Sequence, residues 1–165
     1  MKSPFVAVLM GSDSDLDTIQ ATLDTLEKLG VVYEVRIKSA HRTPEATRDY
    51  IIDAEARGCA VFIAAAGLAA HLAGAVAAQT IKPVIGVPMD AGPLQGQDAL
   101  LSTVMMPGGI PVACVAIGKA GAKNAAYLSA QILAVADADL ALRLKEERRH
   151  NADAIAEKDR LLQQR

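Results

Sequence analysis

The stretch SAHRTPE brings a hydroxyl, an imidazole and a guanidinium into four positions, through Ser39, His41 and Arg42. An imidazole is the side chain best suited to moving a proton near neutral pH. A guanidinium binds phosphate or carboxylate oxygens through charge-assisted hydrogen bonds. These residue types therefore predict a proton-transfer site for a small anion.

A second polar stretch, MGSDSD, contributes Ser12, Ser14 and Asp15. It lies between an apolar run and a helical pattern, so its residues are predicted to stand at a helix N-terminus. The free N–H groups and the dipole of that terminus favour a phosphate. Ser and Asp are also the preferred N-cap residues, and taken alone the stretch favours plain capping.

A third polar position is His71, in the apolar stretch AAGLAAHLAG that also contains Gly67. We expect His71 to lie in the first turns of an apolar helix, where a lone histidine is more often a satisfied interior group than a catalyst. Cys59 and Cys114 stand in separate apolar runs without any CxxC pattern. They indicate two buried thiols in a reducing compartment and neither a disulfide nor a metal site.

The elements that would position these side chains follow from the hydrophobic pattern. We predict strands over residues 5–10, 31–37, 60–65, 83–88 and 112–117. Helical patterns cover 15–29 and 44–57, with Thr43 as N-cap and Gly58 at the end, and further helices follow the later strands. Strands that are apolar on both faces and joined by helices indicate an α/β fold with a five-stranded parallel sheet.

Ligands of such sheets bind beyond the carboxyl ends of the strands, where helix N-termini meet. The three polar stretches follow the first, second and third predicted strands, so we expect them to share one site. A Gly- and Pro-rich loop over 87–102 follows the fourth strand. It is predicted either to cover a ligand or to be an ordinary surface loop.

The length of 165 residues suits one domain, which we divide into an α/β core over 1–136 and a helical tail over 137–165. The tail is charged, with a sparse apolar stripe that fits a solvated helix and a helix packed on another subunit equally well. Between Cys59 and Gly118 only Lys82, Asp90 and Asp98 are charged, so we expect this segment to be the buried half.

The formal net charge of -2 leaves no broad basic surface for a nucleic acid or an anionic membrane. Residues 59–78 carry no formal charge over a length that could cross a bilayer. Gly67, Gly74 and the many alanines favour a buried strand followed by a buried helix instead. The N-terminus lacks the pattern of a signal peptide, and we expect a cytoplasmic protein.

The stretches MGSDSD, SAHRTPE, AAGLAAHLAG, PVIGVP and LLSTVMMPGGIPVACVAIGKAGAKNAA together resemble the class I N5-carboxyaminoimidazole ribonucleotide mutase family of bacterial purine synthesis. The resemblance covers residues 6–133. It implies a flavodoxin-like three-layer sandwich with an extended C-terminal helix. It also implies a homo-octamer with active sites at subunit junctions, a ribonucleotide substrate, and neither a metal nor an organic cofactor.

The resemblance further implies that the carboxylate moves from the exocyclic amine of the substrate to ring carbon C4. His41 would act as general acid while CO2 is released and as base when the C4 proton leaves. The family's substrate-binding residues match Ser12, Asp15 and Arg42, with Ser14 and Ser39 as neighbours, and Gly67 and His71 in the loop over the carboxylate or CO2.

Three positions depart from the family pattern: Leu16 stands where many members have Trp, Leu68 replaces a Gly, and Ala73 replaces a Pro. Two other functions are compatible with the motifs. A class II aminoimidazole ribonucleotide carboxylase would use free CO2, although that class usually lacks the AAHL signature. A non-catalytic sensor would bind a nucleotide phosphate through GSDSD and Arg42, although it would not need an imidazole there.

Overall fold

A five-stranded parallel sheet forms the centre of the computed structural model, which describes residues 4–164. The strands are β1 (Phe5–Met10), β2 (Tyr33–Ile37), β3 (Cys59–Ala66), β4 (Val84–Pro88) and β5 (Ala113–Cys114). Their order is β2-β1-β3-β4-β5, and all neighbours are parallel. This is the doubly wound, flavodoxin-like order, so the predicted fold class is confirmed.

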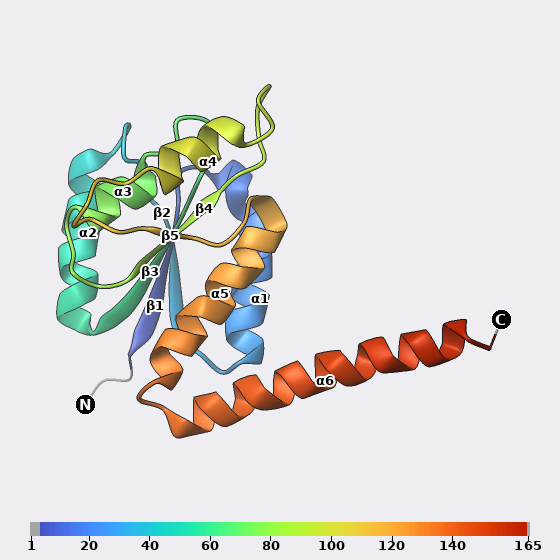
Figure 1. Ribbon diagram of the computed structural model, residues 1–165. Coiled ribbons are helices and arrows are strands. Elements are labelled where there is room, and N and C mark those ends of the chain that lie inside the picture. Colours follow the sequence, from blue (N-terminus) through green and yellow to red (C-terminus); the bar gives the residue numbers. More distant parts are fainter. Residues whose placement is uncertain (1–3, 165) are drawn as a thin grey trace.

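Helices cover both faces of this sheet (Figure 1). They are the short 3-10 helix η1 (Asp13–Asp15), α1 (Leu16–Lys28), α2 (Pro44–Arg57), α3 (Leu72–Ala77), α4 (Gln97–Val104), α5 (Gly118–Ala134) and α6 (Ala138–Leu162). Helices α1 and α5 lie on one face, and α2 and α3 lie on the other (Figure 1). The sheet and its two helical layers make the predicted three-layer sandwich.

Strand β1 supplies both hydrophobic cores, because its successive side chains point to opposite faces. Val6 and Val8 pack on the side of α1 and α5, whereas Ala7 and Leu9 pack on the side of α2 and α3. All six residues of β1 are buried, as expected for an interior strand of a covered parallel sheet. The alanines of α5 are small enough to let that helix approach the sheet closely.

Two predicted strands are shorter than expected. Strand β2 begins at Tyr33 rather than at residue 31, and β5 pairs with β4 only through Ala113 and Cys114. Just beyond β5, Ala116 has a φ of 132°, which is incompatible with extended backbone and ends the strand.

The expectation that residues 59–118 form the buried half is wrong for the connections between elements. Ile81 is 98% exposed, and Leu101 and Met105 are also largely exposed. A shortage of charge does not separate core from exposed apolar surface, and this is why the prediction failed. Within residues 4–164, no helix combines the length and apolar character needed to cross a membrane.

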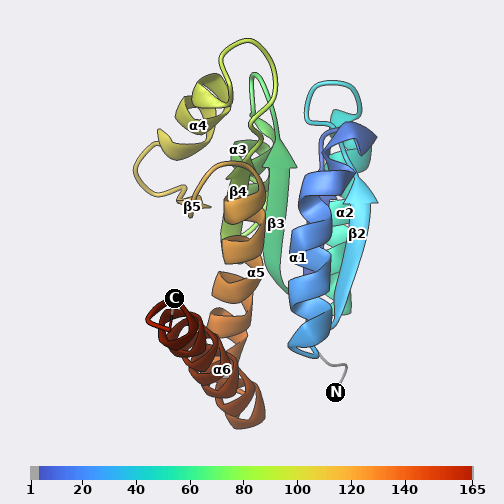
Figure 2. The same ribbon diagram turned by 90° about the vertical axis from the view of Figure 1, so that its right-hand side faces the viewer.

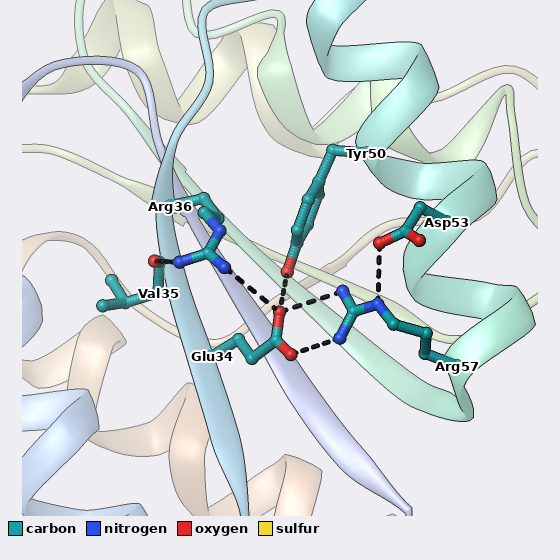
Figure 3. Close-up of polar contacts among 6 residues, drawn as sticks. All are labelled: Glu34, Val35, Arg36, Tyr50, Asp53 and Arg57. Carbon is teal, nitrogen blue, oxygen red and sulfur yellow. Dashed lines mark hydrogen bonds and ion pairs between the residues drawn. The ribbon is translucent and has the colours of Figure 1, made fainter.

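An ion cluster centred on Glu34 ties the edge strand β2 to α2 (Figure 3). Glu34 accepts hydrogen bonds from the Arg57 guanidinium and, at 3.2 Å, from the Tyr50 hydroxyl. Asp53 accepts from Nε of Arg57 at 2.7 Å, and Arg36 lies 3.8 Å from Glu34. The Arg57 guanidinium lowers the pKa of Glu34, and burial raises the pKa of Tyr50. The cluster holds α2 in place behind the loop that contains His41.

Helix α6 begins against the body of the molecule and then leaves it (Figure 1). Leu140 and Leu144 are buried in the core beside α5. Glu147 accepts from Lys28 of α1 at 2.9 Å and from Tyr127 of α5 at 3.0 Å. Every residue from 148 to 164 is exposed. The first part of the predicted tail thus packs on the α/β core, and the second part is exposed. The last residue, Arg165, lies outside the described residues.

Gly121 lets the first turns of α5 pass close to the preceding connection. A β-carbon at Gly121 would lie 2.1 Å from the carbonyl oxygen of Ala116. Alanine is favoured over glycine in helices by about 1 kcal/mol. We nevertheless expect Gly121→Ala to lower the free energy of unfolding by about 1–3 kcal/mol, because the backbone must move to admit the methyl group.

Urea denaturation followed by circular dichroism measures this change. Gly108→Ala is the matched control, since nothing lies within 4 Å of its added β-carbon. A Gly121→Ala variant as stable as the unsubstituted chain would contradict the close approach.

Candidate active site

A cavity of about 310 Å³ lies beyond the carboxyl ends of β1, β2 and β3. Strands β2 and β3 point toward the same end of the molecule, where the connections to the following helices lie (Figure 2). The chain reverses its winding direction between β1 and β3, which is where sheets of this order bind ligands. The cavity is lined by all eight predicted site residues: Ser12, Ser14, Asp15, Ser39, His41, Arg42, Gly67 and His71.

The loop after β1 both caps a helix and lines the cavity. Oγ of Ser12 accepts from the backbone N–H of Ser14 at 3.3 Å and so caps η1. Oγ of Ser14 donates to Asp15 at 3.5 Å. Asp15 is only 8% exposed, and burial raises the pKa of its carboxyl group. Capping therefore explains Ser12 in part. Asp15 stands at the N-cap position of α1 but makes no capping hydrogen bond with its side chain.

Arg42 joins the loop after β2 to the loop after β1. Its Nη2 donates to the carbonyl oxygen of Gly11 at 2.7 Å. Its backbone N–H donates to Oγ of Ser39 at 3.1 Å, and its Nε lies 3.4 Å from the same oxygen. The guanidinium is thus held at the wall of the cavity by two different loops.

Thr43 occupies the predicted N-cap position of α2 but makes no capping bond with its side chain. Its Oγ1 accepts from the backbone N–H of Ser39 at 3.1 Å instead. The predicted N-cap position is confirmed. Thr43 closes the turn that presents His41 and Arg42.

His41 and His71 meet across the cavity. Nε2 of His41 lies 2.8 Å from Nδ1 of His71, and the two rings are nearly perpendicular at 83°. One nitrogen donates and the other accepts, so the two rings share one proton along this contact. The pair orients each ring and offers a proton donor or acceptor toward a bound ligand.

The expectation for His71 needs two corrections. It precedes α3 as the N-cap residue rather than lying within the helix, which begins at Leu72. The backbone of Leu68 has a φ of 55°, which is incompatible with a right-handed helix at this residue. His71 is also exposed rather than a satisfied interior group.

The loop after β3 lies directly against the Gly- and Pro-rich loop after β4. The backbone N–H of Met89 donates to the carbonyl oxygen of Ala66 at 2.9 Å. A β-carbon at Gly67 would come within 3.4 Å of Met89 and 3.6 Å of Ala91. Ala91 also lines the cavity, so this part of the loop covers one side of it, and α4 begins beyond at Gln97.

Sequence reasoning missed the contact between the two imidazoles. The two histidines lie 30 residues apart and follow strands that are not neighbours, so no local pattern indicates that they meet.

Metal binding and catalysis by a cysteine nucleophile find little support in the part of the chain that the structure describes. Residues 4–164 contain no group of three or more His, Cys, Asp and Glu side chains arranged to hold a metal ion. Cys59 and Cys114 are free, and burial raises the pKa of the Cys59 thiol to about 11. A thiol with a raised pKa is a weak nucleophile near neutral pH. The cavity therefore offers acid–base chemistry by histidine beside an anion-binding guanidinium.

Comparisons with known proteins extend this result. The family model described as AIR carboxylase matches residues 5–154. The chain is 51% identical over 154 residues to the N5-carboxyaminoimidazole ribonucleotide mutase of Bacillus subtilis, covering 93% of this chain and 95% of that protein. It is 52% identical to the same-named protein of Brucella melitensis, covering 93% and 94%. The crystal structure of Treponema denticola PurE superposes with a TM-score of 0.88 at 33% identity, covering 97% of this chain and 99% of that one.

The buried carboxylate of Asp15 is expected to lower the stability of the folded protein at neutral pH. Because burial raises its pKa above the ordinary 3.8, ionisation at neutral pH disfavours the folded state. This cost is absent below pH 3.8 and develops as the pH rises through the folded-state pKa. We expect Asp15→Asn to raise the melting temperature at pH 7 and to change it little near pH 3.

Thermal unfolding at the two pH values tests this expectation. Asp49→Asn, which changes an exposed carboxylate on α2, is the control for the loss of one negative charge. A lower melting temperature for Asp15→Asn at pH 7 would show that the carboxylate stabilises the fold.

Proposed function

Because this chain belongs to the AIR carboxylase family, we propose that it catalyses the isomerisation that its mutase relatives are named for. The reaction converts N5-carboxyaminoimidazole ribonucleotide into 4-carboxy-5-aminoimidazole ribonucleotide. The contact between His41 and His71 within the cavity is the observation that carries the proposal. The contact supports the proposal because it brings a proton donor and acceptor to the cavity that Arg42 and Asp15 also line.

The first half of the reaction breaks the bond between the exocyclic nitrogen and the carboxylate carbon. The electron pair of that bond stays on nitrogen, which takes a proton from His41 acting as general acid. CO2 and aminoimidazole ribonucleotide remain in the cavity. His41 is then neutral and ready to accept a proton.

The second half forms the new bond at ring carbon C4. C4 attacks the carbon of CO2, and the pair of electrons from one C–O double bond moves to oxygen to give the carboxylate. His41 then removes the proton from C4, which restores the aromatic ring and returns His41 to its protonated form. Protons and electrons balance over the cycle, so the reaction requires neither a redox cofactor nor ATP.

The substrate's anionic and ribose groups are assigned to the remaining cavity residues. Arg42, Ser12, Ser14 and Ser39 bind the 5′-phosphate, supported by the positive end of α1 beside them. Asp15 accepts hydrogen bonds from ribose hydroxyls, and this use explains a buried carboxylate that destabilises the free protein. Gly67 and His71 lie beside the migrating carboxylate.

The two alternatives receive less support. A class II carboxylase would use free CO2, but His71 and the AAHL signature agree with the mutases, as do the names of the relatives that are about half identical. A phosphate sensor would use Arg42 and the serines and would gain nothing from a pair of imidazoles.

The proposal includes a homo-octamer in the cytoplasm. Exposed apolar side chains on and near α4, including Leu101, Val104 and Met105, form the kind of surface that a second copy of the chain covers. Two free cysteines suit a reducing compartment.

Replacing the proposed general acid separates chemistry from binding. We expect His41→Asn to lower kcat by about 10²–10⁴-fold or more, because an amide does not act as a general acid or base near neutral pH. Binding of the product 4-carboxy-5-aminoimidazole ribonucleotide, measured by calorimetry, should remain close to that of the unsubstituted chain. His150→Asn is the matched control, since His150 is exposed on α6. Turnover retained in His41→Asn would remove His41 from the chemistry.

The choice between mutase and carboxylase rests on which substrate is consumed. We expect little product from aminoimidazole ribonucleotide and low bicarbonate alone. Product should form rapidly once the ATP-dependent synthetase that makes the N5-carboxylated substrate is added. Absorbance of the carboxylated imidazole measures the rate. Efficient product formation without the synthetase would favour the class II reaction instead.

A further inference from the structure

Leu68 combines two unfavourable features that the acid–base chemistry does not explain. Its backbone has a φ of 55°, in the left-handed region that residues other than glycine avoid. Its side chain is 54% exposed at the edge of the cavity, although leucine gains stability when buried. Strain of this kind persists only where surrounding structure maintains it, and it gathers at functional sites.

Gly92, in the loop after β4, is the neighbour that receives this side chain. A β-carbon at Gly92 would lie only 2.6 Å from Cδ2 of Leu68, so a methyl group of the leucine rests against the bare backbone of the glycine. Gly92 itself has a φ of 77°, which glycine adopts without strain. The left-handed backbone of Leu68 thus directs its side chain across the gap between two loops.

This contact is one of several between the two loops. The bond from Met89 to Ala66 and the close approach of Ala91 to Gly67 join the loops nearer the sheet. Leu68 and Gly92 extend the contact outward, toward solvent. The first of these loops also carries His71, three residues after Leu68, so the position of the joined loops bears on the imidazole pair.

We propose that Leu68 is a positioning residue that closes the cavity over CO2 while it is detached from the substrate. This inference rests on the proposed function, in which CO2 must remain beside C4 after the N–C bond breaks. CO2 is small and uncharged, so Arg42 and the serines do not hold it as they hold a phosphate. A leucine packed on Gly92 blocks the way out between the two loops and excludes water.

Escape of CO2 before the new bond forms has a defined product. One N–C bond is broken, the nitrogen has gained one proton, and aminoimidazole ribonucleotide leaves without its carboxylate. Substrate labelled with ¹⁴C in the carboxylate therefore distinguishes escape from transfer. The fraction of label lost as CO2 measures escape, and the fraction retained in the carboxylated product measures transfer.

Leu68→Gly is the first test variant, because glycine accepts a φ of 55° and removes only the side chain. We expect the ratio of lost to transferred label to rise about tenfold, the order expected when a reactant held in place becomes free to diffuse. The melting temperature should not fall. Leu94→Gly is the matched control, since Leu94 is 57% exposed on the loop after β4 and does not line the cavity.

Gly92→Ala tests the contact itself without relying on activity. In the unsubstituted chain the added methyl group collides with Leu68, so we expect a lower melting temperature. In the Leu68→Gly background the collision is gone, so the fall should be smaller. Equal falls in both backgrounds would show that the two side chains do not interact, and would overturn the proposal.

The labelling experiment separates this inference from the proposed function. Unsubstituted protein that does not convert the labelled substrate would overturn the proposed function, and the inference with it. Normal conversion together with an unchanged ratio in Leu68→Gly would overturn the inference alone. A raised ratio in Leu68→Gly, with an unchanged ratio in Leu94→Gly, would support it.

Discussion

The order of the strands is the constraint on which the rest of the site depends. Strand β1 lies between β2 and β3, so the loops that leave its two neighbours close over its carboxyl end. The loop after β2 carries His41 and the loop after β3 carries His71, and the rings meet with nitrogens 2.8 Å apart. In this order a single strand separates the two loops that carry the imidazoles. Burial of all six residues of β1 on both faces keeps this arrangement rigid.

Polar contacts around the cavity connect the loops that carry the reacting groups. Arg42 is bonded to Gly11 and Ser39, so the loops after β1 and β2 move together. Behind them, the cluster around Glu34 fixes the edge strand to α2. An edge strand has a neighbour on one side only, and ion pairs with a helix compensate for the missing ladder. The guanidinium at the cavity wall therefore needs little reorganisation when it binds an anion.

Local signals in the sequence were sufficient for the fold and insufficient for the contacts within the site. Apolar runs and the Pro44 and Gly58 boundaries predicted β1, β3, β4 and α2 closely, because periodicity and helix ends are local properties. The short β5 and the start of α3 were missed, since both depend on positive φ values at Ala116 and Leu68 that residue type does not announce. The rule that ligands bind beyond strand ends selected the cavity residues. The pairing of the histidines depends on strand order, and no single stretch of the chain encodes it.

Some residues that line the cavity have a burial or a backbone conformation that lowers the stability of the folded protein. Asp15 is an ionisable residue in a buried position, and Leu68 has a left-handed backbone that is typical of glycine. His71 is a polar residue within an apolar stretch of the sequence. The burial of Asp15 and the left-handed backbone of Leu68 are unfavourable for folding alone, and both residues line the cavity together with His71. Positive φ values also occur outside the cavity, at Gln95 and Ala116. Buried charge and backbone strain gather at functional sites, so the positions of Asp15 and Leu68 after β1 and β3 support the proposed site.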